Sequence, residues 1–364
     1  MILGILIVFF SIILLIVIHE LGHFLLAKKF GVRVEEFGIG IPPRIYGKKI
    51  GETIYSLNWL PIGAFVKIYG EEEKIKDPRS FSEKPIWQRF FIIAAGVINF
   101  WLVAFILLTF MAKTGMPGVI EDQDIKAENP KVQIIYIQEN SPAQLSGLKT
   151  EDTIKKIQDQ EINKVIDVQE KTKQYLGQEV SLLIERQGEL INTLVFLRES
   201  DEEGALGVGL VRTGIKKYSW YQAPVHGFSM TAKVTSTILI NLSDAFYRLI
   251  TKKPMSDEFE VVGPIGIGVL AFQSLEKGLI DYLWLIVLIS ISLAIFNLLP
   301  IPALDGGRLL FLVIEKIKGK PINNNLEKKL IGVSFIILLG LFFLIVLRDI
   351  LKLEAINNFI QQIK

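Results

Sequence analysis

The chain has 364 residues, of which 50% are hydrophobic and 21% are charged. Its mean hydropathy of +0.41 is too high for an ordinary soluble protein and predicts several membrane spans beside a substantial soluble part. The net charge of +2 gives no reason to invoke a nucleic-acid partner, and the absence of cysteine excludes disulfides and cysteine-ligated zinc sites.

Four stretches of the chain are apolar enough to span a membrane, and we expect them at residues 1–27, 86–112, 280–308 and 330–347. The first is about 39 Å long if helical, at a rise of ~1.5 Å per residue. It has no basic start and no small-residue cleavage site, so we do not interpret it as a signal peptide.

The segments between these spans differ in character. Residues 28–85 alternate β-branched and aromatic residues with turn residues, which predicts a small β-hairpin sheet. Residues 115–214 predict a soluble α+β domain. Residues 219–262 have apolar positions at helical spacing and predict one or two amphipathic helices on the membrane surface. We expect a loop at 309–329 and a C-terminal tail at 348–364.

The placement of lysine and arginine predicts the orientation. The loops after the first and third spans are both rich in basic residues, whereas the N-terminus has none before the membrane. Short basic loops stay in the cytoplasm. We therefore expect the β-rich loop and the 309–329 loop to be cytoplasmic, and both termini and the 115–214 domain to be extracytoplasmic.

The first span contains the motif His19-Glu20-Leu21-Gly22-His23. Residues four apart share one face of a helix, so both imidazoles can bind one metal ion, with the glutamate as general base. Burying these side chains in a membrane is costly without a partner, and zinc is the expected partner. The alternative is a polar patch whose side chains reach the aqueous boundary.

A catalytic zinc site usually has three protein ligands and a water, so a third ligand is needed. Asp305 is the best candidate, because it ends a span broken by Pro300 and Pro302 and precedes a flexible Gly306-Gly307 pair. Irregular backbone at membrane depth is tolerated only inside protein or beside a wet cavity. The alternative for Asp305 is a helix cap or an ion pair with Arg308.

Three further polar residues have weaker predicted roles. Asn297 is a lone amide in an apolar span, and we favour a role in binding substrate over a hydrogen bond between helices. Asn99 follows Gly96, and small residues there indicate close helix packing, with a weaker case for contact with substrate. His226, the remaining one of three histidines, is interpreted as an interfacial or solvated residue and not a ligand.

Taken together, these motifs resemble those of the site-2 protease family, in particular its bacterial regulator-of-sigma-E type. The resemblance covers almost the whole chain. The segments that carry it are His19–His23, Phe37-Gly38-Ile39-Gly40, Gly96–Phe100, Gly263-Pro264-Ile265-Gly266 and Asn297–Gly307. It implies that His19, His23 and Asp305 bind zinc, that Glu20 is the general base, and that Asn297 helps to bind substrate.

The soluble domain resembles a PDZ domain through Ser141-Pro142-Ala143, Gly147-Leu148 and Asp152-Thr153-Ile154. Glu151 stands where glycine is usual, and Ser146 where alanine is common. Elsewhere Arg308 stands where relatives often have histidine, and Ile41-Pro42 replaces a glycine-rich turn. The expected fold class is therefore a multi-pass α-helical membrane protein with four transmembrane helices, a cytoplasmic membrane-associated β-hairpin sheet and one extracytoplasmic α+β PDZ domain.

The resemblance implies regulated intramembrane proteolysis in a bacterial plasma membrane. The expected partners are the lipid bilayer and single-pass membrane proteins, such as anti-sigma factors or remnant signal peptides, already trimmed by another protease. The site would lie near the cytoplasmic face. Two other classes stay open: a non-catalytic membrane adaptor that binds tails through its PDZ domain, and a transporter, against which the lack of repeated halves argues.

Overall fold

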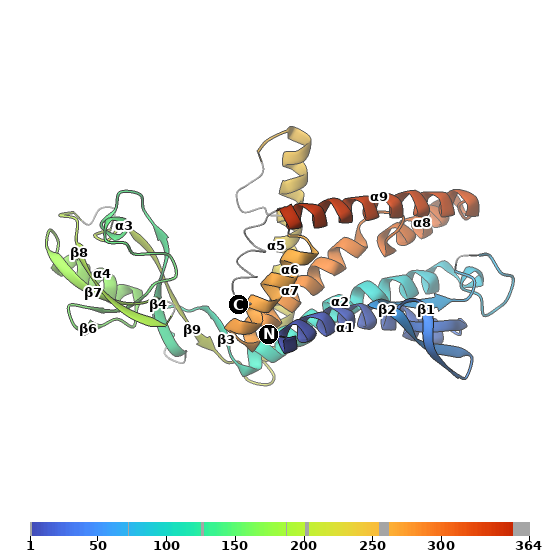
Figure 1. Ribbon diagram of the computed structural model, residues 1–364, viewed down its shortest axis with the longest axis horizontal. Helices are drawn as coiled ribbons and strands as arrows, with labels where there is room; N and C mark the ends of the chain where they lie inside the picture. The colour runs from blue at the N-terminus through green and yellow to red at the C-terminus, as the bar shows by residue number, and fades with distance from the viewer. Residues whose placement is uncertain are drawn as a thin grey trace. The chain divides into compact units, whose positions relative to one another are not determined.

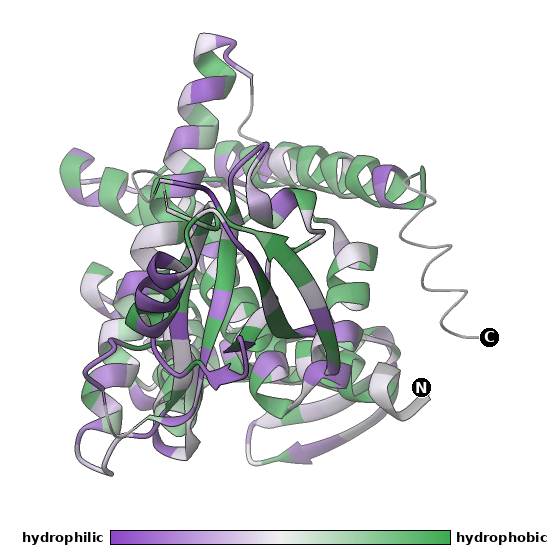
Figure 2. Cartoon of the chain, turned by 90° about the vertical axis from the view of Figure 1, so that its left-hand side faces the viewer, coloured by the Kyte–Doolittle hydropathy of each residue, from purple (hydrophilic) through white to green (hydrophobic). Residues whose placement is uncertain are grey.

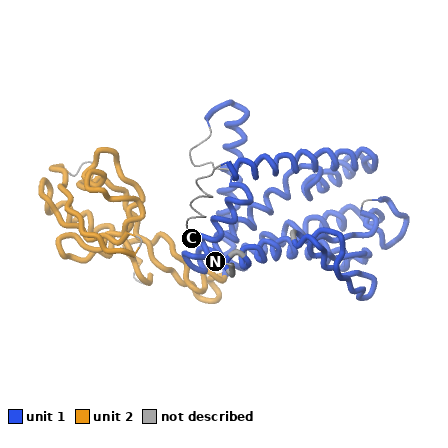
Figure 3. The backbone as a smooth tube through the Cα atoms, viewed as in Figure 1, with its two compact units in different colours: residues 1–109, 224–364 blue, residues 110–223 orange. Residues whose placement is uncertain are grey.

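The computed structural model describes residues 2–71, 73–124, 127–186, 188–200, 204–254 and 262–351. Two compact units make up the chain: unit 1 comprises residues 1–109 and 224–364, and unit 2 comprises residues 110–223 (Figure 3). The expected metal ligands His19, His23 and Asp305 all belong to unit 1.

Four long helices of unit 1 are apolar enough to cross a membrane: α1 (Ile2–Lys29), α2 (Ile86–Thr114), α7 (Leu279–Leu298) and α9 (Asn324–Leu351) (Figure 1). This confirms the expected four apolar helices. The evidence for a membrane span is clearest for α9. None of its described residues is buried by protein, and hydrophobic residues cover most of its length (Figure 2). A helix that is apolar on all sides needs lipid around it.

The third span is shorter than the expected 280–308, because α7 ends at Leu298. Proline has no backbone N–H and cannot continue a helix, so Pro300 and Pro302 enforce the break. The chain then turns and starts a new helix, α8 (Asp305–Lys318). The first part of the expected 309–329 loop is therefore helical.

The amphipathic region forms a single helix, α5 (Ala223–Thr251), and a second helix, α6 (Pro264–Lys277), follows it. Residues 255–261 of the expected 219–262 segment lie outside the described residues, as do residues 352–364 of the expected tail. The Asp349 carboxylate of α9 accepts hydrogen bonds from the Gly263 and Gly266 amides at 3.2 and 3.1 Å. It satisfies amides that the start of α6 would otherwise leave unpaired.

The β-rich loop folds into one antiparallel hairpin, β1 (Val34–Ile50) and β2 (Thr53–Ile68), joined by a turn in which Gly51 has φ +63°. The hairpin curls, so that Ile39 pairs with Leu57 on one side and with Ala64 on the other. Its base packs against the end of α1, where Phe24 meets Phe37 and Tyr55. This sheet therefore adjoins the helix that carries the His-Glu motif.

Unit 2 contains a mainly antiparallel sheet of seven strands, in the order β3-β9-β4-β5-β7-β8 with β6 paired to β5. The bounds are β3 (Met116–Val119), β4 (Glu128–Ile137), β5 (Thr153–Ile157), β6 (Gln160–Glu161), β7 (Glu179–Arg186), β8 (Glu189–Phe196) and β9 (Val208–Lys216), with helices α3 (Pro142–Leu145) and α4 (Val165–Gln174). Its core is aliphatic and includes Ile134, Ile154 and Leu182, all fully buried. Unit 2 thus has an apolar core of its own, as a domain requires.

Asp152 is the polar centre of unit 2. Its side chain is 1% exposed and accepts hydrogen bonds from the Lys149 amide at 2.8 Å and from Nε and Nη2 of Arg186 at 2.7 Å each. The Asp152 carboxylate raises the pKa of the Arg186 guanidinium through this hydrogen bond. The pair joins β7 to the start of β5.

We expect Asp152→Ala to lower the free energy of unfolding of unit 2 by about 2–3 kcal/mol, because it breaks a part-buried hydrogen bond to the Lys149 amide and removes the partner of the Arg186 guanidinium. Urea unfolding followed by tryptic protection of unit 2 measures this. Glu139→Ala, at an exposed carboxylate, is the matched control and should cost less than ~0.5 kcal/mol. Equal unfolding curves for the two variants would contradict the assignment.

The backbone conformation of Glu151 explains why glycine is usual at this position. Its φ is +73°, in the left-handed region that glycine adopts without a steric penalty and other residues rarely adopt. Its amide donates to the Ile134 carbonyl at 2.8 Å, so the turn forms despite the substitution. The departure from the PDZ pattern changes the local strain and leaves the hydrogen bonding in place.

Candidate metal centre

The site is built where α1 crosses α2, and two glycines bring the helices together. A Cβ on Gly22 would lie 2.5 Å from the Ala95 carbonyl oxygen, and a Cβ on Gly96 would lie 2.3 Å from Nε2 of His23. Real Cβ contacts are never this short, so both positions need glycine. The side-chain amide of Asn99 on α2 donates to the Ile18 carbonyl of α1 at 2.6 Å and links the two helices beside their crossing. This agrees with the packing role indicated for Asn99.

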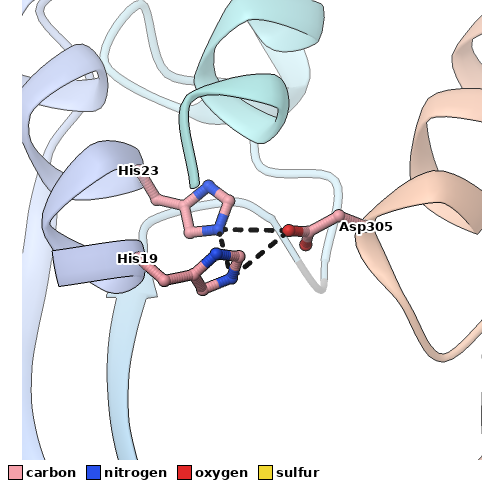
Figure 4. Close-up of side chains that lie close together, drawn as sticks. All are labelled: His19, His23 and Asp305. Atoms are coloured by element: carbon pink, nitrogen blue, oxygen red, sulfur yellow. Dashed lines mark hydrogen bonds and ion pairs between the residues drawn. The ribbon is translucent and has the colours of Figure 1, made fainter. Parts of the chain in front are cut away.

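His19, His23 and Asp305 come together although 282 residues separate the second from the third in the sequence. The two Nε2 atoms are 3.3 Å apart, and Oδ2 of Asp305 lies 3.4 Å from that of His19 and 3.5 Å from that of His23. Figure 4 shows both imidazoles projecting from α1 toward the carboxylate, which comes from the start of α8. The two histidines are buried, and the Asp305 side chain is 13% exposed.

These three atoms fit a tetrahedral zinc ion. Ligand atoms at ~2.0–2.1 Å from zinc in tetrahedral geometry lie about 3.3–3.4 Å from one another, which matches the three measured separations. Oδ2 of Asp305 is buried and accepts no hydrogen bond among the described residues, so it is an anionic atom without a donor. A cation at the centre of the triangle would satisfy it together with the two imidazole lone pairs.

Neighbouring groups orient the imidazoles. Nδ1 of His23 lies 2.9 Å from the Ile92 carbonyl, so it donates there and Nε2 keeps its lone pair for the centre. The ring of His19 stacks on Phe100, with centroids 4.7 Å apart and planes at 20°. The Phe100 carbonyl accepts from the buried Ser290 hydroxyl of α7 at 2.8 Å. Both rings are thus held by α2.

The backbone of the broken span places Asp305. A Cβ on Gly306 or Gly307 would lie 2.2 Å from the carbonyl oxygen of Leu298 or Ile301, so the start of α8 packs directly on the backbone of the break. The two alternative roles of Asp305 are not seen. Leu304 occupies the N-cap position of α8, and the partner of Arg308 is Glu71.

Glu20 lies beside this cluster, half-buried, between the two histidines in the chain. Its carboxylate is within reach of the Val66 backbone of β2. Asn297 behaves differently, because its amide nitrogen donates to the Leu293 carbonyl of its own helix at 2.9 Å. His226 lies on α5 and is not part of the cluster. The structure therefore brings together three of the expected residues and puts Asn297 at the end of α7.

Sequence reasoning missed Phe100 and Ser290 as supports of His19. A signal for Ser290 was present, since it is a hydroxyl in the apolar span of α7 and needs a hydrogen-bond partner there. Phe100 gave no signal, because an aromatic residue in an apolar helix is ordinary.

The chain is similar to known proteins over most of its length. The chain matches the profile of peptidase family M50 over residues 7–341. A Clostridium perfringens protein named as a zinc metalloprotease is 34% identical over 93% of this chain and 95% of its own length. A Fusobacterium nucleatum protein of similar name is 35% identical over 93% and 96%. The regulator of sigma-W protease RasP of Bacillus subtilis is 28% identical over 92% and 93%.

The described residues combine four helices apolar enough to span a membrane with a buried His-His-Asp cluster that could hold a metal ion, which defines the chain as a membrane protein with a candidate metal site. The chain belongs to peptidase family M50, whose members are zinc-dependent metalloendopeptidases. This confirms the resemblance to site-2 proteases and the expected zinc cofactor, and it leaves no support for a transporter.

Proposed function

We propose that this chain is an intramembrane protease that cuts the membrane-spanning segments of single-pass proteins. One zinc ion is held by His19, His23 and Asp305, and Glu20 is the general base. The observation that carries the proposal is the triangle of two imidazole nitrogens and one carboxylate oxygen, with sides of 3.3, 3.4 and 3.5 Å, formed by helices apolar enough to span.

His19, His23 and Asp305 would hold the zinc ion, which would supply Lewis-acid chemistry to the attacking water and the peptide carbonyl. Glu20 accepts a proton from the attacking water and returns it to the departing nitrogen. The water oxygen joins the carbonyl carbon, the C–N bond breaks, and one fragment gains a carboxylate while the other gains an amine. Asn297 would hold the substrate backbone beside this centre once its amide rotates away from Leu293.

Two surfaces support the handling of an extended substrate. The second half of β1, residues 41–50, is exposed and pairs with β2 on one side, so it can accept an unwound segment as an added strand. In unit 2 a groove of about 320 Å³ lies between α4, through Val168 and Thr172, and the start of β9, through Val208. A groove between a helix and a strand suits a peptide terminus, and for this reason we interpret unit 2 as a PDZ domain.

The proposed substrates are single-pass membrane proteins, including anti-sigma factors and remnant signal peptides, that another protease has shortened. The name of the Bacillus subtilis relative, a regulator of sigma-W protease, supports the first class. We propose a bacterial plasma membrane, with the hairpin side cytoplasmic and unit 2 and both termini outside. The alternative function is that of a non-catalytic adaptor. The cluster of His19, His23 and Asp305 argues against it, because an adaptor needs no metal site.

Purified protein in detergent tests the proposal with a tagged single-span substrate. We expect cleavage by the wild type, none after zinc chelation, and recovery when zinc is added back.

Asp305→Ala should lower the zinc affinity by ~100-fold or more, because it removes one of three ligands and the only anionic one. Competition with a chromogenic chelator measures this. Asp281→Ala, at the start of α7, is the control and should bind zinc like the wild type. Unchanged affinity in Asp305→Ala would rule out this residue as a ligand.

A further inference from the structure

A cavity of about 400 Å³ lies along α8 within unit 1. One wall is the α8 face formed by Arg308, Phe311, Leu312 and Glu315. The other walls come from the segment after β2, the start of α2 and the start of α9. Its volume is in the range of sites that bind small ligands or short peptide ends.

This face of α8 begins at the metal centre. Residues three and four apart lie on the same side of a helix. Asp305, Arg308 and Leu312 follow each other at these spacings, so the side that presents Asp305 to the histidines continues into the cavity. The first cavity residue after the ligand is Arg308.

Two arginines line the cavity, and their hydrogen bonds differ. Arg89 donates from Nε to the Lys84 carbonyl at 3.0 Å and from Nη1 and Nη2 to both carboxylate oxygens of Glu315 at 3.1 and 2.6 Å. Arg308 donates from Nη1 to Glu71, and no other hydrogen bond of its guanidinium occurs among the described residues, although the carboxylates of Asp305 and Glu327 also act on its charge. A guanidinium has five N–H donors, so Arg308 retains donors for a ligand whereas Arg89 is committed to the fold.

We propose that this cavity receives the cleaved fragment that ends in the new carboxylate, and that Arg308 binds this carboxylate. The inference rests on the proposed function, because peptide hydrolysis makes the carboxylate at the metal centre. A planar guanidinium binds a carboxylate through two parallel N–H···O bonds. The Phe311 and Leu312 side chains provide apolar contacts for the last residues of a membrane segment.

The side-chain charges around the cavity nearly balance, so the unused donors of Arg308, and not the net charge, would select a carboxylate over the new amine. Lys74 and Lys328 lie at the cavity with the two arginines, facing Glu71, Glu315 and Glu327. Glu315 is bound at both oxygens by Arg89, and Glu71 by Arg308. An ammonium group entering beside Arg308 would meet the positive charge of the guanidinium and could not use its N–H donors.

The test uses a fluorescent apolar hexapeptide with either a free C-terminal carboxylate or a carboxamide, bound to the full-length protein in detergent. Binding is measured by anisotropy in zinc-free protein, so that the metal cannot select the carboxylate. We expect the wild type to bind the acid about tenfold more tightly than the amide. Arg308→Gln should reduce this ratio to about one, and Arg308→Lys should give an intermediate ratio because it keeps the charge and loses the planar fork.

Lys74→Gln is the matched control, since it removes one positive charge from the same cavity and should keep the tenfold ratio. A wild-type ratio near one, or a ratio that persists in Arg308→Gln, would overturn the proposal. A ratio that falls equally in Lys74→Gln would also overturn it, because the preference would then be a general effect of charge. The binding assay needs no turnover, so the two failures can be told apart. A ratio near one beside normal cleavage overturns this inference alone, whereas no cleavage by the wild type overturns the proposed function on which the inference rests.

Discussion

Glu20→Gln is expected to reduce cleavage of a single-span substrate by ~1000-fold or more while the protein still binds one zinc ion. Glutamine has the size of glutamate but cannot accept the proton of the attacking water, and general acid–base catalysis contributes typically 10²–10⁴-fold. The flanking ligands His19 and His23 are unchanged, so the metal triangle stays intact. Single-turnover cleavage, with zinc measured by plasma mass spectrometry, separates the two effects.

The control for this prediction is Glu83→Gln, which alters an exposed glutamate of the short helix η1 (Phe81–Glu83) and should cleave at the wild-type rate. If Glu20→Gln cleaves as fast as Glu83→Gln, Glu20 is not the general base and the adaptor reading gains ground. If Glu20→Gln loses its zinc as well, its role is structural and the assignment of a base fails.

The local features of the fold follow from the sequence because they depend on local chemistry. The four apolar helices, the hairpin after the first of them and the break at Pro300 all follow from hydropathy, β-propensity and the missing N–H of proline. Helix ends were less accurate, since α7 stops at Leu298 and α8 begins seven residues later, at Asp305. The continuation of α8 to Lys318 was missed because its apolar positions form a short run that periodicity alone does not assign.

The metal triangle was predictable because membrane burial makes its residues conspicuous. Two histidines and a carboxylate in apolar surroundings require a common partner, and this chemistry can be read without coordinates. The supports could not be found in the same way. The stacking of Phe100 on His19, the hydrogen bond from Ser290, and the partnership of Arg308 with Glu71 depend on how distant helices pack. Pairings between helices are tertiary facts that no single-helix pattern encodes.

The role of Gly96 also depends on tertiary packing and could not be predicted in detail from the sequence. The sequence marks Gly96 as a small residue near Asn99, which is compatible with helix packing of any kind. Only the structure reveals that two imidazole rings of the proposed zinc site fill the space of the missing side chain: a Cβ on Gly96 would lie 2.3 Å from Nε2 of His23 and 2.7 Å from Cε1 of His19. A residue with no functional group is thereby as closely tied to the proposed chemistry as the ligands themselves.

We therefore expect Gly96→Ala to weaken zinc binding by about 100-fold, because one added methyl group must push both imidazoles off the centre. It should also cost about 1–3 kcal/mol of stability through overpacking. Gly332→Ala on α9 is the control, since its Cβ would meet open space, and it should leave zinc affinity unchanged. Chelator competition on both purified variants decides the matter. Wild-type zinc affinity in Gly96→Ala would mean that the rings do not pack against α2 at this point, and the orientation of both histidines would then have to come from elsewhere.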